Sequence, residues 1–221
     1  MGAVVHWHTA EEMREVAPAS VKLLVGASVY LGPDADWPEY EKLYRRVYVE
    51  QGLKLLRPDG ILLVLQTDAF RDGLFWARNV LLPGVLMAEG FELIDKKIWK
   101  RCKASFFQPP WSDVFAFRPR GGSASRVALN KKKTGYFEGV WDFPQREGGE
   151  LAAYPEALCR LIVETFTEPG DLLLDPFAGT ATLLGIAQSM GREAVGYEIN
   201  EKLREQVDDA LAVQPQQELV K

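Results

Sequence analysis

The stretch LLLDPFAGTATL, residues 172–183, decides the fold of this chain, together with AVGYEIN at residues 194–200. Each contains a short apolar run typical of a buried strand, followed by an acid, Asp175 in one and Glu198 in the other. A segment with helical periodicity lies between them. Strand, helix and strand in this order build doubly wound sheets, in which successive strands are parallel. We therefore predict an α/β fold whose two acids lie at neighbouring strand ends.

The spacing of these segments indicates the kind of ligand. Asp175 and Glu198 are 23 residues apart, close to the spacing at which a nucleotide-binding unit brings a carboxylate to ribose hydroxyls. Dinucleotide sites place several glycines against a pyrophosphate, whereas this loop has Gly179 alone, with Ala181 where a second glycine could stand. A nucleoside without phosphate therefore fits better, and acidic side chains would stabilise the sulfonium cation of S-adenosylmethionine.

The motif DPFAGTATL with GYEIN resembles the cofactor-binding motif and following acidic strand end of the amino (N4-cytosine or N6-adenine) DNA methyltransferases. In the family arrangement with the catalytic motif first, a helix that opens with a Phe-Pro pair precedes the cofactor strand, and Tyr154-Pro155 is similar to that pair. The resemblance covers most of the chain and implies a Rossmann-like, doubly wound, mainly parallel sheet. It places Phe177 near the adenine, and Gly179 and Thr180 near the methionine part. The cofactor-binding residues that it implies are Asp175, Phe177, Gly179, Thr180, Thr182, Glu198, Asn200 and Tyr154.

The rest of the sequence continues the alternation of strands and helices. Buried strands are predicted at 21–25 and 61–65, joined by an amphipathic helix over 37–56 that a turn at 57–60 ends. Further helices are predicted at 75–88, 155–166 and 182–190, and further strands at 91–99, 114–117, 171–174 and 193–197. We predict one domain with a catalytic half at 1–95, a basic, loop-rich, DNA-contacting lobe at 96–146, a cofactor-binding half at 147–211 and a frayed tail at 212–221.

The catalytic motif that the resemblance implies is altered. The family ends a strand with Asp, Asn or Ser, two prolines and an aromatic residue that stacks on a flipped base, whereas residues 27–30 are Ala-Ser-Val-Tyr. Tyr30 keeps the aromatic position, and a shift of one residue would let the Ser28 hydroxyl act, so both are candidate catalytic residues. An alternative is FFQPPW at 106–111, with Gln108 as acceptor, although its position in the chain favours a Pro-rich loop.

A basic segment suggests a nucleic-acid partner. Residues 96–133 hold eleven Lys and Arg and one acid, Asp113, which leaves 15 basic and 30 acidic residues elsewhere. A local basic block in an acidic chain is typical of phosphate binding, although a solvated basic loop is the alternative. The candidate DNA-binding residues are Lys100, Arg101, Lys103, Arg126, Lys131, Lys132 and Lys133.

Other features favour ordinary structural roles. Cys102 and Cys159 form no CxxC pair and are predicted to be reduced thiols. His6 and His8 lack a third ligand nearby in the sequence, so we expect strand residues and no metal site. No apolar run approaches the roughly 20 residues that span a bilayer, and the first ten residues do not resemble a signal peptide, so a cytoplasmic protein is expected.

The resemblance implies transfer of a methyl group from S-adenosylmethionine to an exocyclic amino nitrogen of adenine or cytosine in DNA. The altered tetrapeptide keeps open an impaired or inactive homologue that binds DNA or cofactor as a regulatory partner. Methylation of RNA or of a small molecule is a third hypothesis. Because the basic lobe is short, sequence specificity is expected to need a homodimer or a separate specificity or catalytic subunit.

Overall fold

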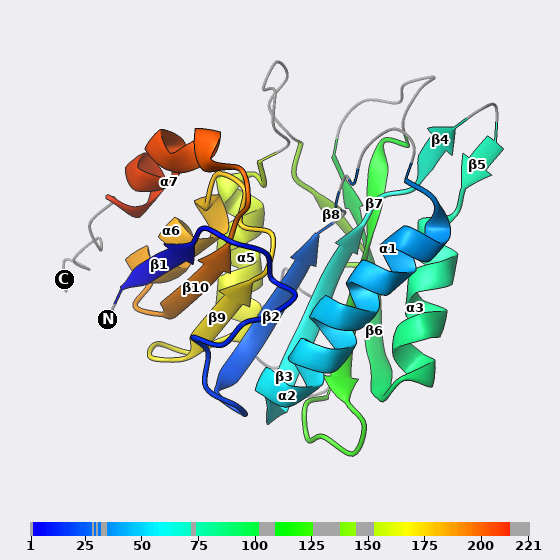
Figure 1. Cartoon of the computed structure of the whole chain (residues 1–221), viewed down its shortest axis with the longest axis horizontal. Helices are drawn as coiled ribbons and strands as arrows, with labels where there is room; N and C mark the ends of the chain where they lie inside the picture. The colour runs from blue at the N-terminus through cyan, green and yellow to red at the C-terminus, as the bar shows by residue number, and fades with distance from the viewer. Residues whose placement is uncertain are drawn as a thin grey trace.

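The structure, a computed structural model, describes residues 2–27, 29, 31, 35–71, 74–101, 109–125, 138–144 and 153–212, without the side chains of residues 69–71. Within these residues, one mixed sheet has the strand order β1-β10-β9-β2-β3-β7-β6-β8 (Figure 1). Its strands are β1 (Ala3–His6), β2 (Val21–Ala27), β3 (Leu56–Gln66), β6 (Phe91–Lys100), β7 (Trp111–Pro119), β8 (Val140–Asp142), β9 (Leu172–Asp175) and β10 (Glu193–Tyr197). A separate hairpin pairs β4 (Ala69–Arg71) with β5 (Leu74–Trp76).

The predicted doubly wound, mainly parallel α/β fold is confirmed. Strands β1, β10, β9, β2 and β3 are parallel to one another, whereas β7 runs antiparallel to both β3 and β6. The helical segments are α1 (Trp37–Tyr44), the π-helix η1 (Arg45–Gln51), α2 (Gly52–Leu55), α3 (Arg78–Ala88), α5 (Glu156–Phe166), α6 (Thr182–Ser189), the 3₁₀ turn η3 (Glu201–Leu203) and α7 (Arg204–Leu211).

Helices cover both faces of the sheet. One core cluster joins the sheet to α5, α6 and α7 through residues such as Leu158, Leu184 and Val207. The other cluster joins the opposite face to α1, η1 and α3 through residues such as Tyr44 and Leu82. Figure 1 shows α1 and α3 lying across β3 and its neighbours on the near side of the sheet. Each face therefore has its own apolar core.

The predicted helix over 37–56 and the turn at 57–60 need correction. The helix begins with a capping box between Asp36 and Glu39, but it passes through the π-helical segment η1 and ends at Leu55. Residues 57–60 belong to β3, as a bulge: Val21 is opposite Leu56, whereas Leu23 is opposite Ile61. A side chain at position 60 would put its Cβ 2.9 Å from two carbonyl oxygens, so the bulge requires glycine there.

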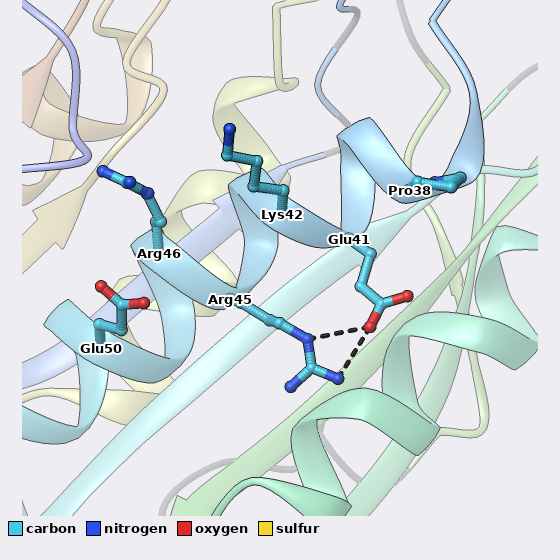
Figure 2. Close-up of a pocket in the computed structure, with 6 residues that line it drawn as sticks. All are labelled: Pro38, Glu41, Lys42, Arg45, Arg46 and Glu50. Atoms are coloured by element: carbon cyan, nitrogen blue, oxygen red, sulfur yellow. Dashed lines mark hydrogen bonds and ion pairs between the residues drawn. The ribbon is translucent and has the colours of Figure 1, made fainter.

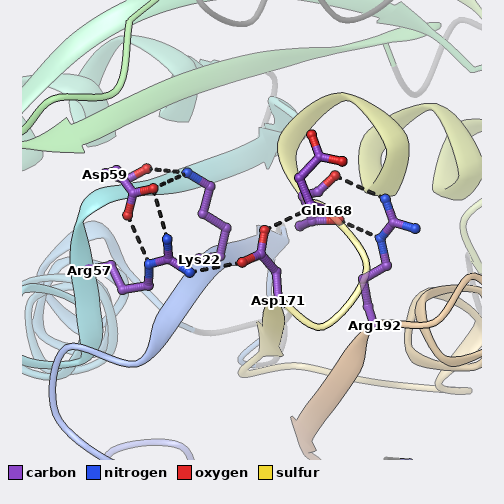
Figure 3. A network of polar contacts seen from close by, with 7 residues as sticks. Lys22, Arg57, Asp59, Glu168, Asp171 and Arg192 are labelled. Atoms are coloured by element: carbon purple, nitrogen blue, oxygen red, sulfur yellow. Dashed lines mark hydrogen bonds and ion pairs between the residues drawn. The ribbon is translucent and has the colours of Figure 1, made fainter.

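A polar network links the amino ends of the parallel strands (Figure 3). The Lys22 ammonium donates to the Asp59 carboxylate at 2.7 Å. The Arg57 guanidinium binds two acids, with its Nε atom 2.8 Å from Asp59 and its Nη1 atom 2.8 Å from Asp171. Partial burial opposes ionisation, but the hydrogen bonds from Lys22 and Arg57 hold the pKa of Asp59 below its usual value. These ion pairs lie near the amino ends of the parallel strands, whereas Asp175 and Glu198 lie at the carboxyl ends.

Two helical glycines should respond in opposite directions to alanine. At Gly185 of α6, an added Cβ would lie 2.3 Å from the carbonyl oxygen of Ala210 in α7, whereas at Gly84 of α3 it would meet nothing within 4 Å. We expect Gly185→Ala to lower the free energy of unfolding by about 1–3 kcal/mol through overpacking. Gly84→Ala should raise it by about 0.5–1 kcal/mol, because alanine restricts the unfolded chain. Urea unfolding measures both changes, and shifts of the same sign would contradict the packing of α6 on α7.

Candidate functional site

The ends of β9 and β2 form the point at which the sheet changes direction. After β9 the chain continues into α6 on one face, whereas after β2 it continues into α1 on the opposite face, and the two strands are neighbours. In open α/β sheets, ligands bind beside the carboxyl ends of strands at such a switch point. Asp175 is the last residue of β9, and Glu198 directly follows β10. The predicted placement of both acids at neighbouring strand ends is therefore confirmed.

Backbone amides hold both carboxylates in place. The amide of Phe177 donates to Asp175 Oδ1 at 3.0 Å. The amide of Gly179 donates to Glu198 Oε2 at 2.9 Å, and that of Asn200 donates to Glu198 Oε1 at 2.7 Å. Glu198 thus joins the loop after β9 to the loop after β10. Each of its oxygens has a second lone pair, so the carboxylate can accept from two hydroxyls of a ligand at once.

The loop between β9 and α6 turns through two left-handed residues. Gly179 has φ of 54° and Ala181 has φ of 56°. The conformation favours glycine, and an alanine in it costs roughly 1–2 kcal/mol. Ala181 thus adopts the left-handed backbone conformation that favours glycine, at the position where a second glycine could stand. The Thr180 and Thr182 hydroxyls lie 3.1 Å apart beside this turn. The loop needs no second glycine to make its tight entry into α6.

Asp175 carries an unusual ionisation. Its carboxyl is 3% exposed, and burial, with the nearby Glu198 charge, raises its pKa to about 7 against the opposing effect of the Phe177 amide. The group is therefore divided between its neutral and charged forms near neutral pH. A cation bound beside it would favour the charged form.

Tyr154 supplies an unpartnered polar atom close to this carboxyl. Its hydroxyl is buried and makes no hydrogen bond to the part of the chain that the structure describes. Its ring packs edge-on against Trp99, with ring centroids 5.7 Å apart. Burial, and then the charge of Asp175, raise the pKa of Tyr154 well above its usual value, so the hydroxyl keeps its proton. A buried donor without an acceptor is costly, which makes a ligand atom a suitable partner.

The other predicted cofactor residues take distinct places. Phe177 packs edge-on against Tyr48, with ring centroids 6.2 Å apart. The backbone amide of Asn200 positions Glu198. Its side-chain oxygen accepts from the Lys202 amide and so caps the start of η3. Sequence reasoning missed Ile199, which is 74% exposed beside Glu198. An exposed branched apolar side chain at a strand end was the signal for it.

The predicted catalytic residues Ser28 and Tyr30 lie outside the described residues, as does the alternative acceptor Gln108. The backbone on either side of Tyr30 is described. The Val29 carbonyl accepts from Arg78 at 3.5 Å, and the Leu31 amide donates to the Tyr40 hydroxyl at 3.2 Å. The guanidinium of Arg78 lies 5.2 Å from the centre of the Tyr40 ring, so the two anchors contact each other.

A third tyrosine contacts the start of the altered tetrapeptide. The Tyr48 hydroxyl donates to the Ala27 carbonyl at 3.3 Å. An added Cβ at Gly26 would lie 2.5 Å from that hydroxyl, so the glycine makes room for Tyr48. Sequence analysis placed Tyr40 and Tyr48 in the amphipathic helix over 37–56 and Arg78 in the helix over 75–88, and gave none of them a role at the site. Nothing in the sequence indicated that these helical side chains contact residues 27–31, the predicted catalytic loop.

The described part of the basic segment belongs largely to β6 and β7. Its cations make internal ion pairs: Lys96 with Asp113 at 2.7 Å and Lys100 with Asp142 at 2.6 Å. Arg101 donates to the Pro109 carbonyl at 2.9 Å. The remaining candidates, Lys103, Arg126, Lys131, Lys132 and Lys133, lie outside the described residues.

Three further features bear on function. An open surface pocket along the outer side of α1 and η1 contains none of the strand-end residues, and its lining is Pro38, Glu41, Lys42, Arg45, Arg46 and Glu50 (Figure 2). Cys159 is buried, as expected, while Cys102 lies outside the described residues. In the described ranges, no helix combines the length and the apolar character needed to cross a membrane.

Two curated methyltransferases are similar to this chain in sequence. The DNA adenine methyltransferase YhdJ of Escherichia coli strain K12 is 40% identical over 67 residues, which are 28% of this chain and 23% of YhdJ. The type II methyltransferase M.MjaI of Methanocaldococcus jannaschii is 27% identical over 211 residues, with 80% of this chain and 66% of M.MjaI covered. The chain thus spans less than two thirds of the length of these curated relatives.

Solved structures share the whole fold. A protein of Thermus thermophilus classed as a DNA modification methylase superposes with a TM-score of 0.79 and 26% identity, covering 96% of this chain and 95% of that one. PvuII DNA methyltransferase, which is cytosine-N4-specific, gives a TM-score of 0.76 at 16% identity, with coverage of 96% and 93%. The second likeness is one of fold alone.

A family model described as DNA methylase matches residues 39–209. The match includes the strand-end acids Asp175 and Glu198 and the helical residues Tyr40, Tyr48 and Arg78. The resemblance predicted from the sequence motifs is confirmed. Because the model matches well over half of the chain, the protein belongs to the N6/N4 DNA methylase family.

Proposed function

We propose that this protein transfers a methyl group from S-adenosylmethionine to an exocyclic amino nitrogen of adenine or cytosine in DNA. The observation that carries the proposal is the pair of amide-held acids, Asp175 and Glu198, at neighbouring strand ends. Two comparisons support it. The Thermus thermophilus protein has also been solved in complex with S-adenosyl-L-methionine, and a family model for DNA methylases matches this chain.

The residues at the strand ends suit this cofactor. Glu198 offers two oxygens for the ribose hydroxyls, and the exposed Ile199 beside it offers an apolar surface for the purine. Asp175 is the buried carboxyl that a sulfonium cation would hold in its charged form. The unpartnered hydroxyl of Tyr154 is a donor for a polar atom of the ligand. When bound, S-adenosylmethionine supplies a methyl group activated by its positive sulfur.

The catalytic loop has to position the target amine. Such an amine is a poor nucleophile because its lone pair is delocalised into the base, so acceptors must hold its N–H groups as it becomes tetrahedral. On this chain the acceptors would be the Ser28 hydroxyl and the backbone carbonyls next to it, with Tyr30 stacking on the flipped base. Arg78 and Tyr40 contact the backbone of Val29 and Leu31, the described residues on either side of Tyr30.

One observation favours a second candidate function, that of a regulatory partner without turnover. Ala27 has no side-chain acceptor, its carbonyl already accepts from Tyr48, and both family prolines are absent. Losing one preorganised hydrogen-bonding group costs about a hundredfold or more in rate in comparable sites. Incorporation of tritiated methyl groups into unmethylated genomic DNA separates the two functions, because a regulatory partner would bind without incorporation.

The pKa of Asp175 predicts how cofactor affinity depends on pH. Asp175 is largely neutral below its pKa of about 7 and charged above it, so rising pH should favour the cationic cofactor. We expect calorimetry to show the ratio of affinities for S-adenosylmethionine over its demethylated product, whose sulfur is neutral, rising up to about tenfold between about pH 6 and about pH 8. Asp175→Asn should abolish this rise, whereas Asp142→Asn, which changes an exposed acid, should keep it. An unchanged pH dependence in Asp175→Asn would contradict the role of Asp175.

Substitutions at two positions test the predicted catalytic loop. We expect Tyr30→Ala to lower methyl incorporation into DNA severely, because the flipped base loses its stacking partner, while Tyr30→Phe retains most of it. Ser28→Ala should cost about a hundredfold if the hydroxyl holds the amine. The affinity for S-adenosylmethionine should stay at the wild-type value in all three variants. Full activity in both alanine variants would rule out this mechanism.

The salt dependence of DNA binding tests the basic segment. If Lys131, Lys132 and Lys133 each contact a phosphate, replacing all three with alanine should reduce the slope of log K against log salt by up to about 2.7. A control variant replaces three exposed lysines from other parts of the chain, Lys42, Lys54 and Lys202, and should keep the wild-type slope. Equal slopes for both triple variants would exclude phosphate contacts by this run.

A further inference from the structure

Three potential metal ligands meet beside the cofactor end of the sheet without belonging to the methylation site. They are His6, His8 and Glu15, and their ligand atoms all lie within 4.8 Å of one another. The Nε2 atom of His8 is already 3.1 Å from Oε1 of Glu15. Ligand atoms around a tetrahedral Zn²⁺ are roughly 3.3 Å apart, given metal–ligand bonds of about 2.0–2.1 Å. Small side-chain rotations would therefore bring all three onto one ion.

The two histidines, His6 at the end of β1 and His8 in the bend that follows it, lie next to each other. Trp7, between them, packs against the apolar core, and the guanidinium of Arg204 lies 4.4 Å from the centre of its ring. The imidazole rings of His6 and His8 instead lie beside each other, with ring centres 5.9 Å apart. The centres of both imidazole rings lie 5.2 Å from that of the Tyr197 ring, which is the neighbour of His6 in the parallel pairing of β1 with β10.

Hydrogen bonds orient two of the three ligands. His8 Nδ1 lies 3.0 Å from the Thr9 carbonyl, which can only accept, so Nδ1 carries a hydrogen and Nε2 faces Glu15. The Tyr197 hydroxyl donates to Glu15 Oε2 at 2.9 Å, which leaves Oε1 toward His8. In metal sites, such outer hydrogen bonds commonly fix the histidine tautomer and the carboxylate orientation. Hydrogen bonds of this kind hold His8, through the Thr9 carbonyl, and Glu15, through the Tyr197 hydroxyl.

We propose that His6, His8 and Glu15 bind a divalent transition metal of the Zn²⁺ class, with Tyr197 positioning Glu15. Two imidazoles and one carboxylate are the donor set that borderline divalent metals prefer over Mg²⁺ or Ca²⁺. The third ligand that sequence analysis did not find is Glu15, seven residues beyond His8. Three protein ligands leave a further coordination position for water.

The metal would connect three parts of the chain. His6 ends β1, Glu15 lies in the segment before β2, and Tyr197 ends β10. The amide of Glu198 donates to the His6 carbonyl at 3.0 Å, so the ion would bind next to the residue proposed to hold the ribose. None of the three ligands is a cofactor residue, so metal binding is measurable without cofactor or DNA.

Calorimetric titration of the untagged full chain with ZnCl₂ tests the proposal. The chain has two histidines, so every imidazole ligand comes from this cluster. We expect one ion per chain and a loss of affinity of about a hundredfold in His8→Ala and in Glu15→Gln. Both residues are exposed, so these variants should fold. Tyr197→Phe should lower affinity about tenfold with unchanged stoichiometry. Co²⁺ should give the visible absorption of a nitrogen- and oxygen-bound ion in the wild type and not in His8→Ala.

Two control variants separate this site from other ligands. Glu12→Gln changes an exposed acid of the same segment and should bind as the wild type does. Cys102→Ser removes a thiol outside the described residues and should also leave affinity unchanged. The proposal is overturned if no saturable binding occurs below about 100 µM free Zn²⁺. It is overturned equally if His8→Ala and Glu15→Gln bind as the wild type does, or if Cys102→Ser alone abolishes binding.

Discussion

The burial of the Asp175 carboxyl at the end of β9 is the constraint on which the site depends. A charged carboxylate in an apolar core is costly, and here burial raises the pKa of Asp175 to about 7. The loop after β9 offsets part of the cost by turning the Phe177 amide back onto Asp175, and the same loop offers the Gly179 amide to Glu198. The sheet order makes these acids neighbours, because β9 and β10 are adjacent and parallel. A cationic nucleoside ligand would satisfy both acids at once.

The strand-helix alternation of the cofactor half was predictable because each element there matches one local pattern. Strand β10 and helix α6 lie within one residue of their expected bounds. The helix over 37–56 was harder, since a π-helical segment keeps an apolar face and leaves the sequence periodicity almost unchanged. The Pro-Asp-Gly segment at 58–60 has turn composition, but the chain uses it as a strand bulge anchored by ion pairs from Lys22 and Arg57.

The candidate site was predictable where motif residues act through the chain near them. Backbone amides of the loop after β9 hold both acids, that of Phe177 binding Asp175 and that of Gly179 binding Glu198, so motif spacing identified the two acids. Residues that act over long sequence distances were not predictable. Arg78 and Tyr40 reach Val29 and Leu31 of the predicted catalytic loop from two different helices, and Glu15 joins His6 and His8 only because the segment before β2 folds back against β10. No local sequence pattern indicates contacts between residues so far apart in the chain.

The most direct test of this account is the ionisation of Asp175 itself, followed by ¹³C NMR of its carboxyl carbon as pH is varied. Without ligand the account predicts a midpoint near 7, since burial opposes the charged form. With S-adenosylmethionine bound, the midpoint should fall by about one unit or more, because a neighbouring cation favours the carboxylate. A midpoint near the ordinary value of about 4, unmoved by the cofactor, would contradict the claim that this buried acid holds the charged part of the methyl donor.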